Sequence, residues 1–281
     1  MFFHKARRHG VRLLLTVLLS LAASSSPASA TTFNGTSIKI RVLFIGNSYT
    51  YYNNLPQIVT ALATSANQTL ETEMIATGGA TLKKHWEDGR ALEALKRGHW
   101  DYVVLQEQST LGFTTGGSQI NSPKMFHEYA RLFNAEIIKV GAKTVFFLTW
   151  ARQNLPQTQA ALTEAYLAIA KELKAIVAPV GIAWQRALKN NPSLALHQKD
   201  LSHPTPMGSY LSACVIVTTL FGKTSVRLTP RVLGNAVDAT GRVLAEPVSG
   251  GNGNGTVELV SLSKSESAFL QQIARETAIR R

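Results

Sequence analysis

Residues 39–50 read KIRVLFIGNSYT, an apolar run that ends in glycine, asparagine and serine. Short runs rich in valine, isoleucine, leucine and phenylalanine are typical of strands in a parallel sheet, so we place a strand at Lys39–Ile45. Gly46 permits a tight turn, and Ser48 then presents a hydroxyl in a loop that enters a helix. The stretch therefore predicts the first strand–turn–helix unit of an α/β domain.

The same alternation of short apolar runs and longer amphipathic stretches continues along the chain. Repeated units of this kind predict a three-layer α/β/α sandwich around a parallel sheet. We place the other strands at Leu70–Ala76, Tyr102–Gln106, Thr144–Thr149 and Ile176–Ile182. We place helices at Leu55–Ala66, Leu82–Arg97, Pro123–Val140, Gln157–Lys174, Pro206–Phe221 and Ser263–Ile279.

The pattern weakens after Gly222. We expect one domain over residues 31–281, with an irregular glycine-rich insertion at about residues 223–256. The run Ser249–Gly255 has the composition of a flexible loop and lacks the GK[ST] ending of a phosphate-binding loop.

The first 30 residues have the order of a secretory signal peptide. A basic region precedes an apolar stretch from about Leu13 to Ala23, and Ala28-Ser29-Ala30 forms the cleavage site. The apolar stretch is shorter than the ~20 residues that a membrane-spanning helix needs. We therefore expect cleavage near Ala30, a secreted or periplasmic protein, and no transmembrane segment in the mature chain.

The chain is basic and contains a single cysteine. Its formal net charge of +12 falls to +8 when the four cations of the signal peptide are removed. No dense Lys/Arg run or nucleic-acid motif accompanies this charge, so we expect no nucleic-acid partner. The charge fits either a polyanionic substrate or surface, or a generally basic solvated surface. Cys214 lies in an apolar helical pattern, so we interpret it as a buried thiol, and no internal disulfide can form.

Candidate chemistry lies beyond the carboxyl ends of the strands, where ligands gather in an open parallel sheet. A serine hydroxyl is a weak nucleophile unless a base takes its proton and an acid orients that base. Asp200 and His203 are three residues apart, so the carboxylate can accept from one imidazole nitrogen while the other faces Ser48. Pro204 biases His203 towards an extended backbone, which helps fix its direction.

Taken together, these motifs resemble the SGNH (GDSL-type) hydrolase superfamily over nearly the whole mature chain, and in particular a bacterial, often exported, branch. The resemblance implies a flavodoxin-like sandwich with a five-stranded parallel sheet, and ester hydrolysis without a cofactor. It also implies that Ser48 is the nucleophile, His203 the base and Asp200 the residue that orients the histidine. The matching blocks are Ile45–Thr50, Gly78–Leu82, Trp100–Ser109 and Asp200–Leu211.

The same resemblance implies an oxyanion hole made by the backbone N–H groups of Ser48 and Gly79 and by a side-chain amide. The superfamily usually has asparagine at this third position, whereas this chain offers Gln106 and Gln108. Either amide is a donor, but the extra methylene changes its reach. Block alignment favours Gln108, with Gln106 as the rival donor and Gly78 as a rival to Gly79.

Other residues beside these blocks are candidates for substrate binding: Asn47, Tyr49, Gln106, Glu107 and Trp150. Arg152 follows the fourth strand together with Trp150 and could reach the same pocket. The alternative for Glu107 is a structural hydrogen-bonding role, and for Tyr49 it is packing of its loop. For Trp150 and Arg152 the alternative is a capped strand end with an exposed arginine. His85 and His127 lie in helical patterns, and no motif supports a metal site.

These observations predict a serine esterase that acts on carboxylic esters, with short-chain acyl or acetyl groups, on small molecules or on carbohydrate. Two alternatives remain open. One is an O-acyltransferase to a glycan, which uses the same triad chemistry. The other is a non-catalytic glycan-binding module on the same fold.

Overall fold

The computed structural model describes Met1 and residues 39–111, 121–222, 227–244 and 256–278. The expected signal peptide and the glycine-rich run at residues 249–255 lie outside the described residues. Within the described ranges, none of the helices has both the length and the apolar character that crossing a bilayer requires.

Five parallel strands form the central sheet, in the order β2-β1-β3-β4-β5. At the carboxyl edge, Gly46 of β1 lies opposite Ala76 of β2, and Ile45 lies opposite Leu105 of β3, so the loops that follow these three strands begin side by side. The strands are β1 (Lys39–Gly46), β2 (Thr69–Ala76), β3 (Tyr102–Leu105), β4 (Lys143–Phe147) and β5 (Ile176–Ala178).

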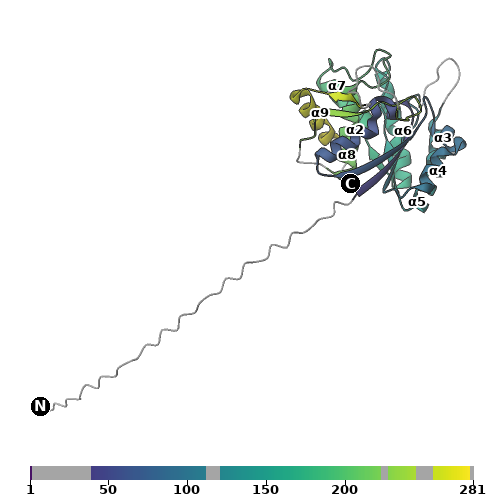
Figure 1. Cartoon of the computed structure of the whole chain (residues 1–281), viewed down its shortest axis with the longest axis horizontal. Helices are drawn as coiled ribbons and strands as arrows, with labels where there is room; N and C mark the ends of the chain where they lie inside the picture. Colours follow the sequence, from purple (N-terminus) through teal and green to yellow (C-terminus); the bar gives the residue numbers. More distant parts are fainter. Residues whose placement is uncertain (2–38, 112–120, 223–226, 245–255, 279–281) are drawn as a thin grey trace. The chain divides into compact units, whose positions relative to one another are not determined.

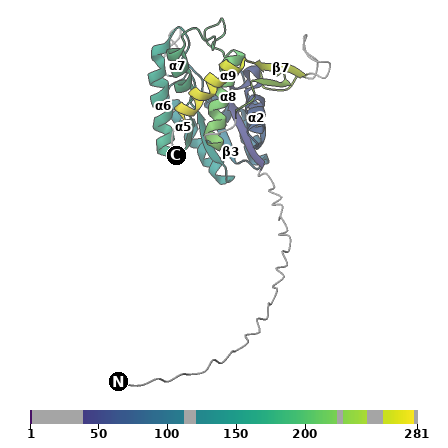
Figure 2. The same cartoon turned by 90° about the vertical axis from the view of Figure 1, so that its left-hand side faces the viewer.

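Helices cover both faces of this sheet, as Figures 1 and 2 show. Because side chains alternate along β1, Val42 and Phe44 belong to one apolar core and Leu43 and Ile45 to the other. The first core is shared with α2 (Leu55–Ser65), α7 (Val180–Asn190), α8 (Pro206–Phe221) and α9 (Lys264–Thr277). The second is shared with α3 (Leu82–Asp88), α4 (Arg90–Arg97), α5 (Pro123–Lys139) and α6 (Gln159–Leu173). The predicted three-layer α/β/α sandwich is confirmed.

Two predicted elements differ in the structure. The helix predicted over Leu82–Arg97 is divided at Gly89, whose φ of 76° lies in the left-handed region. The strand predicted over Ile176–Ile182 ends at Ala178, and helix α7 begins at Val180. Pro179 has no N–H to continue the strand ladder, and an apolar run after it fits a buried helix as well as a strand.

The region after α8 contains an antiparallel ribbon of β6 (Arg231–Asn235) and β7 (Thr256–Ser261). Figure 2 shows it beside α2 and α8, and Val232 and Val260 of the ribbon join the core that those helices share. The prediction of an irregular insertion at about residues 223–256 missed β6, because the β-branched signal in Arg231–Asn235 is short and interrupted by Gly234.

Candidate active site

Loops from several parts of the chain meet beyond the carboxyl edge of the sheet, around a cavity of about 210 Å³. Ser48 reaches it from the start of helix α1 (Ser48–Tyr51), directly after β1. Gly79 follows β2, Gln108 follows β3, and His203 precedes α8. The cavity is lined by Asn47, Ser48, Tyr49, Gly79, Gln108, Ser109, Arg152, Ser202 and His203.

The turn that carries Ser48 is clamped on both sides. Asn47 caps α1, since its Oδ1 accepts from Tyr49 N at 3.1 Å, and its Nδ2 donates to the carbonyl of Ala80 at 2.9 Å. A Cβ at Gly46 would lie 2.3 Å from Thr50 Oγ1 and 2.6 Å from Gln106 Oε1, so the turn requires glycine. The Gly-Asn-Ser motif therefore holds the serine in one position.

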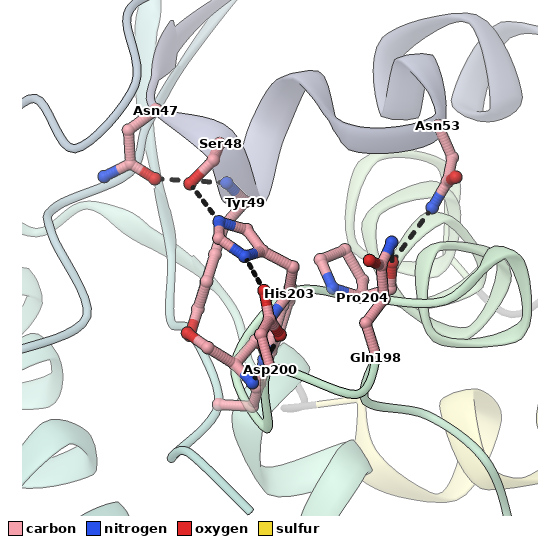
Figure 3. A network of polar contacts seen from close by, with 10 residues as sticks. Asn47, Ser48, Tyr49, Asn53, Gln198, Asp200, His203 and Pro204 are labelled. Atoms are coloured by element: carbon pink, nitrogen blue, oxygen red, sulfur yellow. Dashed lines mark hydrogen bonds and ion pairs between the residues drawn. The ribbon is translucent and has the colours of Figure 1, made fainter. Parts of the chain in front are cut away.

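Ser48, His203 and Asp200 form a continuous line of hydrogen bonds (Figure 3). The distance from Ser48 Oγ to His203 Nε2 is 2.9 Å, and that from His203 Nδ1 to Asp200 Oδ2 is 2.5 Å. The structure thus brings together the three residues predicted to form the triad, although Ser48 and His203 are 155 residues apart.

Asp200 is held as a carboxylate by its own turn. Its Oδ1 accepts from the backbone N–H groups of Ser202 at 3.0 Å and His203 at 2.9 Å. Partial burial by itself would raise the pKa of Asp200, but these bonds and the bond from the His203 ring lower it to about 2. A carboxylate accepts only, so His203 Nδ1 carries a proton that it donates to Asp200, and Nε2 of the neutral ring can accept from Ser48.

Aromatic rings and polar side chains fix the segment around His203. The ring of Tyr52 stacks on the imidazole with centroids 4.2 Å apart. Trp150 Nε1 donates to the carbonyl of Ser202 at 3.0 Å, and Ser202 Oγ is 2.8 Å from Tyr49 Oη. Asn53 and Gln198 both donate to the carbonyl of Pro204, the residue after the histidine (Figure 3).

Three donors on residues that line the cavity have no acceptor in the described part of the chain: the N–H groups of Ser48 and Gly79 and the Nε2 amide of Gln108. The rival Gly78 N–H donates to the carbonyl of Ala239 at 3.2 Å. Gln108 Oε1 accepts from N and Oγ1 of Thr110, both at 2.5 Å, which leaves the NH₂ end of the amide as the available donor. This is the arrangement that an oxyanion hole requires.

Comparison with known proteins identifies the fold. No family model matches the chain, and no curated protein matches its sequence. Among solved structures, one assigned to the SGNH hydrolases, from Slackia heliotrinireducens, is 25% identical, with a TM-score of 0.53 over 65% of this chain and 99% of that one. The chain has the fold of the SGNH hydrolases.

Two further structures share this SGNH fold at lower identity. A protein from Bacteroides uniformis that belongs to a family of unknown function is 17% identical, with a TM-score of 0.58 over 85% of this chain and 94% of its own. An acetyl xylan esterase is 16% identical, with a TM-score of 0.53 over 65% of this chain and 100% of its own. The predicted resemblance to the SGNH hydrolases is confirmed.

Two of the residues predicted to bind substrate in this SGNH fold lie beneath the cavity and do not line it. Gln106 is fully buried; its Oε1 accepts from Asn47 N and Thr50 Oγ1, and its Nε2 donates to the carbonyl of Glu107. Glu107 is 1% exposed, and its carboxyl accepts from the N–H groups of Leu82 and Gln108. Burial raises the pKa of Glu107 to about 8, against the effect of those two bonds. The predictions that Gln106 is an oxyanion donor or a substrate ligand, and that Glu107 is a substrate ligand, are therefore wrong.

The other predicted substrate contacts also have structural partners. Trp150 is 1% exposed and lies between the rings of Tyr49 and Trp184, at centroid distances of 4.3 Å and 3.9 Å. Tyr49 and Asn47 line the cavity but are each 3% exposed, and their polar atoms bond within the protein. Trp150 does not line the catalytic cavity, so the prediction that it binds substrate is replaced by a supporting role, whereas substrate binding by Asn47 and Tyr49 stays a prediction.

Of two further residues near the site, His85 gave no signal in the sequence that separates it from an ordinary helix residue, whereas Arg152 was expected to reach the pocket from the end of the fourth strand. His85 of α3 is buried, its Nε2 lies 2.7 Å from the carbonyl of Gly46, and burial lowers its pKa. The neutral ring therefore donates to the last residue of β1, next to the Ser48 turn. Arg152, after β4, lines the cavity itself. Within the described residues, no three His, Cys, Asp or Glu side chains are grouped as metal ligands.

Proposed function

We propose that this protein is a serine esterase that hydrolyses carboxylic esters through an acyl-enzyme on Ser48. The observation that carries the proposal is the line of hydrogen bonds from Asp200 through His203 to Ser48, which ends at a cavity with unpaired donors. Ester hydrolysis also agrees with the esterases among the structures that share the fold.

In the first step, Ser48 Oγ attacks the ester carbonyl while His203 Nε2 takes the hydroxyl proton. Asp200 stabilises the imidazolium that forms, and the N–H groups of Ser48 and Gly79 and the amide of Gln108 stabilise the negative oxygen. His203 then gives the proton to the leaving alcohol. In the second step, water attacks the acyl-enzyme with His203 again as base, and the acid is released.

The cavity favours a short acyl group. Its volume of about 210 Å³ lies below the ~300 Å³ at which pockets for drug-sized ligands begin. Acetyl and other short-chain esters, on small molecules or on carbohydrate, therefore fit the proposal best, and the acetyl xylan esterase with the same fold supports a carbohydrate ester.

The test is hydrolysis of 4-nitrophenyl acetate by the wild type and by Ser48→Ala. We expect Ser48→Ala to lower kcat by about 10⁴-fold or more, since the triad members act as a unit. Ser193→Ala is the matched control, because Ser193 is exposed and bonds only to Asn191. Equal activity in wild type and Ser48→Ala would exclude the serine mechanism. Release of free acetate without an added acceptor distinguishes hydrolysis from acyl transfer to a glycan.

We also propose that the protein is secreted or periplasmic and that residues 1–30 are removed as a signal peptide. The proposal rests on the basic, apolar and Ala-x-Ala order of those residues. N-terminal sequencing of the exported protein should then read from about Thr31. A mature protein that still begins at Met1 would contradict it.

A further inference from the structure

Arg152 lies at the boundary between two cavities. It lines the catalytic cavity with Ser48 and His203, and it also lines a neighbouring cavity of about 280 Å³ together with Trp184, Lys189 and His197. Its backbone is held on both sides, since Ala151 N donates to Gln159 Oε1 and Leu155 N donates to the carbonyl of Arg152. The backbone from which the Arg152 side chain extends is therefore held in place beyond the end of β4.

The guanidinium has no partner in the described part of the protein. No hydrogen bond or ion pair joins it to a described residue, and its Nε is buried without an acceptor. Arginine keeps its charge at every ordinary pH, and a buried donor left unpaired is costly. By contrast, exposed arginines elsewhere in the protein, such as Arg131 and Arg186, pair with glutamates.

The surroundings of Arg152 are positive and contain no free carboxylate. Among the described residues, no aspartate or glutamate lines either cavity, and Lys189 adds a second cation to the neighbouring cavity. Asp200, close by in the His203 loop, already accepts from His203 and Ser202. Apart from Glu246 and the C-terminal carboxylate, all acidic groups of the chain belong to the described residues, and none pairs with Arg152.

We propose that Arg152 binds a carboxylate of the substrate, so that the esterase prefers short acyl esters whose alcohol part carries a negative charge, as in an acylated acidic sugar. The planar guanidinium matches a carboxylate through two parallel hydrogen bonds, which a neutral substrate cannot supply. Ser48 and Arg152 line the same small cavity, and the alcohol oxygen of an ester is bonded directly to the carbonyl carbon that Ser48 attacks, so a charged group on the alcohol part can reach Arg152. This inference rests on the proposed esterase function and adds the substrate class to it.

The test compares two acetyl esters that differ in one charge, 4-acetoxybenzoate and its methyl ester. The measured quantity is the ratio of kcat/KM for the anionic ester to kcat/KM for the neutral ester, in wild type and variant, so that the difference in intrinsic reactivity cancels. We expect Arg152→Gln to lower this ratio by about 10- to 100-fold, the size for a hydrogen bond to a charged group. Arg152→Lys keeps the charge but loses the two parallel hydrogen bonds, so its ratio should lie between that of the wild type and that of Arg152→Gln.

Arg186→Gln is the control, because Arg186 lies on α7, pairs with Glu276 and lines neither cavity. Its ratio should equal that of the wild type. A ratio that Arg152→Gln leaves unchanged, in a variant with native circular dichroism, would overturn the inference while leaving the esterase intact. If the wild type hydrolyses neither ester and equals Ser48→Ala, the proposed function fails, and the substrate preference fails with it.

Discussion

Gln106 and Gln108 are two residues apart, yet their side chains lie in different surroundings. The Gln106 amide is buried and bonded at both ends, to Asn47 and Thr50 on one side and to Glu107 on the other. The Gln108 amide lines the cavity and has only its oxygen engaged. We therefore expect Gln106 to affect the stability of the Ser48 turn and Gln108 to affect the reaction.

At this scale we predict that Gln108→Ala lowers kcat about 10²- to 10³-fold on 4-nitrophenyl acetate, because it removes one oxyanion donor. Its unfolding free energy should stay close to that of the wild type. Gln106→Ala is the matched comparison: it leaves buried donors unpaired, so the unfolding free energy should fall by about 2–3 kcal/mol in guanidinium titrations. If both variants lose kcat equally at unchanged stability, the assignment of the donor to Gln108 is wrong.

At the scale of elements, Glu107 connects the end of β3 to the start of α3. Its carboxyl accepts from the backbone N–H of Leu82, the first residue of that helix, and from that of Gln108. His85, one turn further along α3, donates to the carbonyl of Gly46 at the end of β1. Helix α3 thereby ties together the ends of the two strands whose loops carry Ser48 and Gln108.

The raised pKa of Glu107 predicts a pH dependence of stability. The pKa of Glu107 is about 8 in the folded protein, whereas its ordinary value is 4.5. Between pH 4.5 and pH 8 the folded state therefore holds a proton that the unfolded state has lost. Stability from this group is complete below pH 4.5 and is lost as the pH rises through 8, by on the order of 5 kcal/mol. In guanidinium unfolding at pH 5, 7 and 9, the wild type should lose stability relative to Glu107→Gln as the pH increases.

Glu164→Gln is the control for this measurement, because Glu164 is exposed on α6. Its difference from the wild type should be the same at all three pH values. A constant difference for Glu107→Gln as well would show that the buried carboxyl is ionised throughout this range.

At the scale of the whole molecule, stability comes from the two apolar cores on either side of the sheet. The chain has one cysteine, Cys214, which is buried in α8 where burial raises the pKa of its thiol. The interpretation of Cys214 as a buried thiol agrees with this position. With a single cysteine, the chain depends for its stability on packing where many exported proteins use disulfides.

We therefore predict that the midpoint of guanidinium unfolding is the same with and without dithiothreitol. Cys214→Ala should lower the unfolding free energy by about 1 kcal/mol through lost packing, independently of the reductant. A midpoint that falls when the reductant is added would reveal a disulfide between two copies of the chain.

The sequence by itself determined the positions of the five sheet strands, six of the helical regions and the three residues of the proposed triad. Those features depend on local signals: strand and helix periodicity, a glycine where a Cβ would meet Thr50, and an aspartate placed to bond the histidine three residues later. The ribbon strands β6 and β7 and helix α7 were missed, because both strands are short and α7 begins with the apolar run Val180–Trp184, which fits a strand as well as a helix.

Only the tertiary structure decided which polar side chains face the cavity. Gln106 and Asn47 are 59 residues apart, and Trp150 and Ser202 are 52 apart, so no spacing in the chain shows that these pairs are in contact. Whether an amide, an indole or an arginine is available to a substrate depends on whether another part of the chain already binds it. For the Nε2 amide of Gln108 and the guanidinium of Arg152 no described residue does, and for Gln106, Glu107 and Trp150 a distant residue does.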